Sequence, residues 1–160
     1  MRPRLPVSLL PPLLLALLSS ACAGSRVGDA EVRLQQSLPC FGVTSREADA
    51  APTLALNALL VHDLAVQPPR QVWSLLVRPH AAALPLTATA CVTYGQVPAG
   101  YDGEAALPLQ AGHAYEVYLN AAPERGLRVR HGYNARFCLQ GGVQGAQLQP
   151  LPPNSVSCRP

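Results

Sequence analysis

Prolines recur along the whole of this chain and limit the folds that it can adopt. There are 17 prolines among its 160 residues. Each proline removes a backbone hydrogen-bond donor and interrupts a helix, so a helical bundle is disfavoured. The length suits one domain with a hydrophobic core rather than two. We therefore expect a single domain rich in short strands and turns.

Several segments alternate apolar and polar residues with the period of a half-buried strand. The clearest is residues 71–78, where Trp73 and Val77 share one face. Residues 53–65 also suit a helix by their leucine and alanine content, and we favour strands there. Residues 45–52 are expected to be a polar loop. Strands are expected at residues 31–36, 39–43, 53–66, 71–78, 86–94, 105–109, 114–120, 127–140 and 146–151.

Short strands separated by frequent turns predict an all-β fold. We expect an immunoglobulin-like β-sandwich of seven to nine short antiparallel strands over residues 31–151. Trp73, the single tryptophan, is expected to fill the core between the sheets. Residues 152–160 form a proline-rich tail that should be loose unless Cys158 pins it.

The N-terminus has the pattern of a secretory signal. Arg2 and Arg4 precede a leucine-rich run over residues 9–18, and small residues then lead to Cys22. The apolar run is too short to span a bilayer as a finished helix. We expect residues 1–21 to be a lipoprotein signal peptide and residues 22–30 a flexible tether.

Cys22 stands where a bacterial lipoprotein signal places the cysteine that receives fatty acids such as palmitate. The aliphatic residue usual three positions earlier is replaced by Ser19. Ordinary cleavage before Gly24, which would give a free periplasmic protein, and an uncleaved anchor are the alternatives. Ala23 is compatible with the outer membrane of a Gram-negative bacterium, because many inner-membrane lipoproteins carry aspartate there.

Four cysteines remain if Cys22 carries lipid. An even number in the oxidising periplasm predicts two disulfides. Of the three pairings that are possible, we expect Cys40–Cys91 and Cys138–Cys158. A zinc site is the alternative, and it is disfavoured because the sequence has no Cys-x-x-Cys pair.

Charge gives no reason to expect a nucleic-acid partner. Removing Arg2 and Arg4 from the 12 basic residues leaves ten arginines against nine acidic residues, a balance near neutrality, and the chain has no lysine. Neither a Gly-x-Ser-x-Gly nor a His-Glu-x-x-His motif is present. The four histidines are expected to be solvated or satisfied in the core, with convergence on a metal as the alternative.

Arginines gather near the C-terminal part of the domain. Arg128 and Arg130 share one face of a predicted strand, and Arg125 and Arg136 lie nearby in the sequence. This cluster either recognises an acidic partner or forms a solvated strand edge blunted by charge. We take Arg128 and Arg130 as candidate partner contacts.

Two tyrosines are further candidate partner contacts. Tyr94 and Tyr101 lie in a segment rich in glycine and proline. Aromatic side chains in such loops anchor many interfaces. The alternative is that they pack the loop onto the sheet.

Several stretches resemble a known family. They are the first strand with Cys40, the segment Ala90-Cys91-Val92-Thr93-Tyr94-Gly95, the run LQAGHAYEVYL at residues 109–119 and YNARFCL at residues 133–139. With the leader, and over about residues 31–140, they resemble a family of small bacterial periplasmic lipoproteins assigned as type VI secretion immunity proteins. The resemblance implies a protein that binds and neutralises a toxic effector delivered into the periplasm.

We therefore expect a lipid-anchored periplasmic immunity protein that occludes a protein toxin stoichiometrically. We expect no enzymatic activity, cofactor, metal or nucleic-acid partner. The alternatives are a structural or assembly lipoprotein of an envelope complex and a module that binds a small molecule or a glycan.

Overall fold

The computed structural model describes residues 27–51, 54–123, 131–141 and 147–158. Within these residues the fold is all-β, as predicted, with ten strands instead of seven to nine and one short helix. The elements are β1 (Val27–Gln35), β2 (Leu38–Val43), α1 (Ser45–Ala50), β3 (Leu54–Asp63), β4 (Arg70–Val77), β5 (Leu84–Pro85), β6 (Val92–Thr93), β7 (Tyr101–Gly103), β8 (Ala114–Pro123), β9 (Gly132–Gln140) and β10 (Gln147–Leu151).

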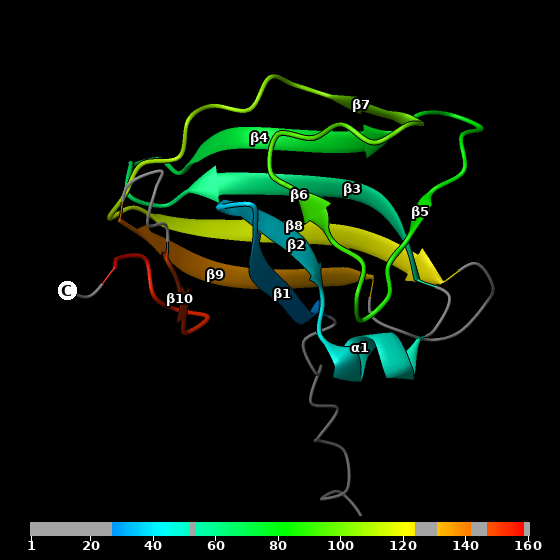
Figure 1. Cartoon of the computed structure of the whole chain (residues 1–160), viewed down its shortest axis with the longest axis horizontal. Coiled ribbons are helices and arrows are strands. Elements are labelled where there is room, and N and C mark those ends of the chain that lie inside the picture. The colour runs from blue at the N-terminus through cyan, green and yellow to red at the C-terminus, as the bar shows by residue number, and fades with distance from the viewer. Residues whose placement is uncertain (1–26, 52–53, 124–130, 142–146, 159–160) are drawn as a thin grey trace, which may run out of the picture.

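The strands form one continuous, curled sheet (Figure 1). Its order is β6-β2-β1-β9-β8-β3-β4-β7, with β10 beside β9 and β5 beside β3. Strand β1 joins the two parts of this sheet, because residues 27–29 pair with β9 in parallel and residues 30–35 pair with β2. The immunoglobulin-like sandwich is therefore not confirmed, since such a sandwich has two separate antiparallel sheets.

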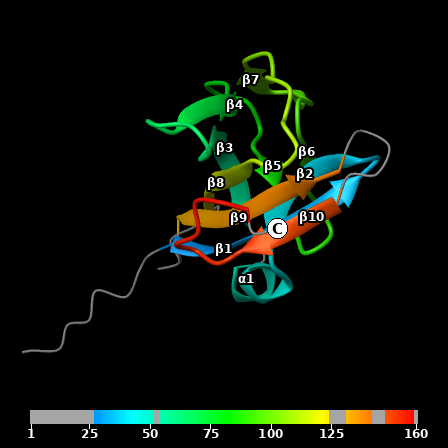
Figure 2. The same ribbon diagram turned by 90° about the vertical axis from the view of Figure 1, so that its left-hand side faces the viewer.

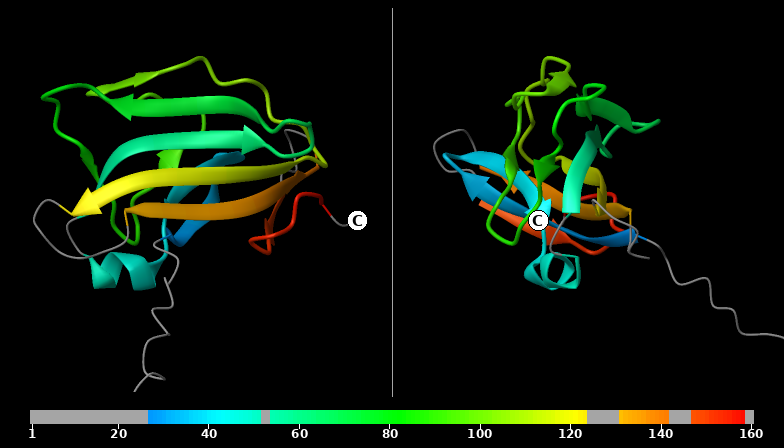
Figure 3. Two further views of the ribbon diagram at one scale, coloured as in Figure 1. Left: turned by 180° about the vertical axis from the view of Figure 1, so that it is seen from behind. Right: turned by 90° about the vertical axis from the view of Figure 1, so that its right-hand side faces the viewer.

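In the view of Figure 1, the curl places β2 in front of the broad sheet formed by β4, β3, β8 and β9. The left panel of Figure 3 shows this broad sheet from behind. Phe41 of β2 packs against Trp73 of β4 and Phe137 of β9, with ring centroids 6.3 and 5.9 Å apart. Trp73 is fully buried, which confirms its predicted place in the core. Aromatic contacts thus join the two layers of the core.

Strand β3 confirms the choice of strand over helix in the ambiguous segment. Leu54 and Leu56 are buried, and the next buried positions are Leu59 and Val61. The inward-facing positions shift by one residue because the pairing with β8 is irregular between Leu56 and Ala58.

The loop predicted for residues 45–52 is wrong, because Ser45–Ala50 form helix α1. Thr44 caps this helix: its hydroxyl accepts a hydrogen bond from the Glu47 backbone N–H at 3.4 Å. A threonine followed three residues later by glutamate is a capping-box sequence. Local capping thus selects a short helix in a polar segment.

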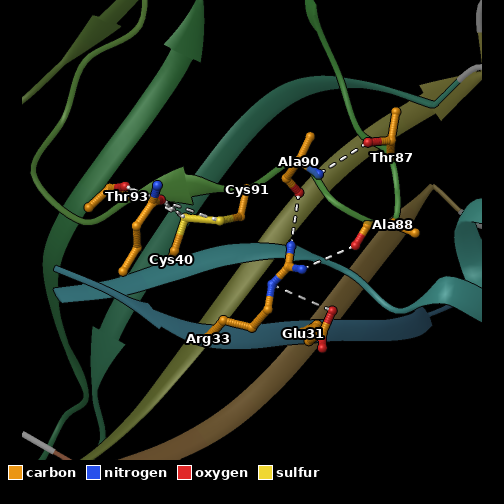
Figure 4. The surroundings of a disulfide bond; sticks show 9 residues. Glu31, Arg33, Cys40, Thr87, Ala88, Ala90, Cys91 and Thr93 are labelled. Carbon is orange, nitrogen blue, oxygen red and sulfur yellow. Dashed lines mark hydrogen bonds and ion pairs between the residues drawn. A yellow bond between two sulfur atoms is a disulfide. The ribbon is translucent and has the colours of Figure 1, made fainter. Parts of the chain in front are cut away.

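The strands predicted at residues 86–94 and 105–109 are also wrong. Only Val92–Thr93 of the first segment forms a strand, and the second forms none. The Arg33 guanidinium takes the place of a neighbouring strand, because it donates to the carbonyl oxygens of Ala88 and Ala90 at 3.2 and 3.4 Å (Figure 4). A side chain therefore satisfies carbonyl groups that a ladder would otherwise use.

Both ends of the described domain are attached to the sheet, the N-terminal end by residues of β1 that the sequence did not predict as strand and the C-terminal end by a disulfide that it did predict. Strand β1 begins at Val27, so the predicted tether over residues 22–30 overlaps a strand. The predicted disulfides Cys40–Cys91 and Cys138–Cys158 are both formed, with Cα atoms 5.5 and 5.7 Å apart. The second disulfide fastens the tail to β9.

Candidate functional site

A cleft opens where strand β1 leaves strand β9. The edge of β9 pairs with β1 as far as Asn134 and with β10 from Arg136 onward, so Ala135 lies at the vertex of a fork. Figure 2 shows the three strands running together on this side of the molecule. The cleft encloses about 430 Å³, a volume in the range of ligand-binding pockets. Its walls are residues 29–32 of β1, residues 134–137 of β9 and Leu148, Pro150, Leu151 and Pro153.

The charged groups of the cleft are paired with one another or with neighbours. Arg136 donates to Glu116 at 2.8 Å and to the Ser155 carbonyl oxygen at 3.1 Å. Asp29 at the opposite rim contacts Arg46 at 2.6 Å. The interior contributes apolar groups from Val32, Phe137, Leu148 and Leu151. The cleft therefore offers an apolar interior with a rim of balanced charge.

The prediction that Tyr94 contacts a partner is wrong. Its side chain is buried in the core, where its ring lies 5.1 Å from that of Trp73. The Tyr94 hydroxyl lies 2.6 Å from the carbonyl oxygen of Leu107, to which it donates. Burial raises the pKa of Tyr94 well above its ordinary value, and the nearby Tyr115 adds to the increase. Tyr94 fastens the loop after β7 to the sheet.

Tyr101 is likewise buried, so the prediction of a partner contact is wrong for this residue too. Its hydroxyl donates to the carbonyl oxygen of Leu56 and accepts from the backbone N–H of Leu84. Burial raises the pKa of Tyr101 above its ordinary value. The alternative that these tyrosines pack loops onto the sheet is therefore confirmed for both.

The buried tyrosines predict a loss of stability at alkaline pH. The unfolded chain releases tyrosine protons near the ordinary pKa of 10.0, whereas the raised pKa of Tyr94 keeps its proton in the fold. The unfolded state then binds fewer protons, so the free energy of unfolding falls as pH rises above about 10. Each such tyrosine contributes up to about 1.4 kcal/mol per pH unit. Urea titrations followed by Trp73 fluorescence between about pH 8 and about pH 11 measure this slope.

The matched variant is Tyr94→Phe, which removes one titrating hydroxyl from the core. We expect it to be less stable near neutral pH, because the bond to Leu107 is lost, and to have a shallower slope above pH 10. A slope equal to that of the unmodified protein would contradict the role assigned to Tyr94.

The predicted arginine contacts have different outcomes. Arg128 and Arg130 lie outside the described residues, as does the lipidation candidate Cys22. Arg136 is described, and its side chain is mostly buried in the ion pair with Glu116. Arg136 therefore supports the wall of the cleft and does not extend an exposed arginine face.

Sequence reasoning missed one pair of polar side chains, Asp63 and His113. The Asp63 carboxylate is buried, and its Oδ2 lies 2.9 Å from Nδ1 of His113. Its Oδ1 accepts from the backbone N–H of Ala65 at 2.9 Å. Such a pair can orient a general base, yet no hydroxyl or thiol hydrogen-bonds to His113 among the described residues. In this structure the pair ties the end of β3 to the turn before β8.

No family model, curated protein or solved structure matches this chain. Membership of the immunity-protein family therefore stays a prediction. In the ranges that the structure describes, no helix is long and apolar enough to cross a membrane. The same ranges bring together no group of three or more His, Cys, Asp or Glu side chains that could hold a metal ion.

Proposed function

We propose that this protein is an exported, lipid-anchored periplasmic protein that binds and neutralises a toxic protein effector. In this proposal it is the immunity protein of a type VI secretion system. It acts by stoichiometric occlusion, so one copy blocks one toxin molecule. Lipid at Cys22 holds the domain at the outer membrane, where it meets the incoming effector.

The observation that carries this proposal is the pair of disulfides in a small β domain. Disulfides form and persist in oxidising compartments, such as the bacterial periplasm, and are rare in the cytosol. Cys40–Cys91 and Cys138–Cys158 use all four of the cysteines that follow Cys22. The leader pattern before Cys22 supports the same compartment.

A rigid domain of this kind suits tight binding. The two disulfides and the aromatic core fix the walls of the cleft before a partner arrives, which lowers the ordering cost of association. Val32, Phe137 and Leu148 offer apolar surface inside it. A standard interface needs only a few well-buried anchors to reach high affinity.

The direct test is binding to the purified product of the neighbouring gene, which this proposal expects to encode the toxin. We expect a one-to-one complex with a Kd below about 1 μM in a calorimetric titration. Co-expression should also restore growth of cells that export the toxin to the periplasm. The matched control lacks residues 1–21 and stays in the cytosol, so it should not protect. A titration without heat of binding at micromolar concentrations would refute the immunity function.

A further inference from the structure

Strand β1 has a backbone edge that no described strand uses. Over residues 31–35 it pairs with β2 on one side only, whereas the parallel pairing of Asp29 with Asn134 uses the N–H of Ala30. The strands on its other side are β9, which it leaves after Asp29, and β10, which pairs with β9 alone. The free edge of β1 therefore runs along the wall of the cleft.

Hydrogen bonds at both ends of the β1–β2 hairpin fix which residues point to this edge. The Asp29 carbonyl accepts from the Thr44 N–H at 3.4 Å, so Asp29 points toward β2. The Pro39 carbonyl oxygen accepts a hydrogen bond from the Tyr94 backbone N–H at 2.8 Å, so it points toward β6. Leu34 lies opposite Pro39 on β1 and is therefore not hydrogen-bonded to that carbonyl group. Because backbone groups alternate along a strand, those of Ala30, Val32 and Leu34 all point away from β2. The parallel pairing of Asp29 with Asn134 uses the N–H of Ala30, so the free N–H groups are those of Val32 and Leu34.

This edge has few of the features that usually protect a strand from pairing. Residues 31–35 contain no proline, the chain has no lysine, and the two charged residues of the segment, Glu31 and Arg33, pair with each other at 3.8 Å. Arg33 directs its guanidinium to the carbonyl groups of Ala88 and Ala90 and not across the edge. Strand β10, on the opposite wall, carries Pro150, which has no N–H to donate. The β1 edge is thus the wall suited to a new ladder.

We infer that the free edge of β1 at Val32 and Leu34 binds an extended segment of the protein partner by strand addition. This inference rests on the proposed function and names the surface used. Free N–H and C=O groups that recur every second residue, about 7 Å apart, match an extended backbone. Apolar side chains of the segment enter the cleft between Val32 and Phe137. The part of the bound segment that lies in the cleft is uncharged, because the ion pairs Asp29–Arg46 and Arg136–Glu116 neutralise the charges at the rim of the cleft.

Amide hydrogen exchange, resolved by residue with NMR, tests this inference on the mature protein. The probe is the purified product of the neighbouring gene, which the proposed function expects to be the toxin. In the free protein the amides of Val32 and Leu34 should exchange fast, whereas those of Glu31 and Arg33 are protected by β2. In the complex the amides of Val32 and Leu34 should become at least about tenfold slower. The amides of Glu31 and Arg33 serve as the internal control.

A variant adds a second readout. Leu34→Pro changes an exposed residue, removes one donor from the free edge and leaves the ladder to β2 intact, so we expect about tenfold weaker binding of the same probe. Leu76→Ser changes an exposed side chain on β4, far from the fork in the strand order, and should bind normally. If Leu34→Pro does not fold, which Trp73 fluorescence reports, the exchange measurement still tests the inference.

The outcomes separate this inference from the proposed function. A complex that leaves the exchange of Val32 and Leu34 unchanged overturns strand addition and leaves the immunity function standing. If no complex forms, both strand addition and the immunity function are refuted. Protection of these amides in the free protein that increases with its concentration assigns the edge to a second copy of this chain, which also overturns the inference.

Discussion

Replacing Cys40 and Cys91 with alanine is expected to lower the free energy of unfolding by about 4 kcal/mol. The same change at Cys138 and Cys158 should cost about 3 kcal/mol. The difference arises because the first disulfide closes a separation of 51 residues and the second only 20. A longer closed loop removes more conformational entropy from the unfolded chain. Guanidinium titrations of both double variants, followed by Trp73 fluorescence, give the two values.

The comparison of the two variants is its own control, because both remove one disulfide from the same domain. Cys40 and Cys138 are both fully buried, so the cavities left by alanine are similar in kind. A larger loss for the Cys138–Cys158 variant would contradict the loop-closure account. It would indicate that the disulfide between the tail and β9 contributes more to the free energy of unfolding than the disulfide between β2 and the segment around Cys91.

Trp73→Ala is expected to cost about 3–5 kcal/mol, because it empties the centre of the core. The indole is fully buried and contacts the rings of Phe41 and Tyr94, with centroids 6.3 and 5.1 Å away. Since these two residues belong to β2 and to the loop after β6, the contact joins the layers of the curled sheet. Thermal and urea unfolding followed by circular dichroism measures the loss, because the variant has no tryptophan.

Trp73→Phe separates the volume of the indole from its polar group. The Trp73 Nε1 atom is buried and has no hydrogen-bond partner among the described residues. Phenylalanine keeps most of the apolar contact and removes a buried donor that lacks an acceptor. We expect a cost below about 2 kcal/mol. A loss as large as that of Trp73→Ala would show that the indole N–H has a stabilising partner.

Local sequence patterns predicted the central strands well. Alternation located β4, where Trp73 and Leu75 are buried on one face, and β8, where Tyr115, Val117, Leu119 and Ala121 are buried on one face. The helix-like spacing in β3 has a physical cause, since the irregularity after Leu56 places the next buried leucine at Leu59. Helix α1 could have been predicted from Thr44 and Glu47, whose spacing is that of a capping box.

The candidate site depends on contacts that no local pattern encodes. The fork forms because Val27 pairs with Gly132 in parallel, over a separation of more than one hundred residues. The Asp63–His113 pair spans 50 residues along the chain, so no local pattern marks it. Tyr94 and Tyr101 were assigned to the surface because turns surround them. Their hydroxyls instead satisfy distant carbonyl groups, which only the folded chain brings within reach.

The proposed function requires that the chain is exported and works as an oxidised, disulfide-closed domain. Mass analysis of the protein isolated from its native host, alkylated before reduction, measures both properties at once. We expect Cys40 to be joined to Cys91 and Cys138 to Cys158, none of the four to be alkylated, and the leader to be absent. A protein with an intact leader and four alkylated cysteines would contradict the proposed function.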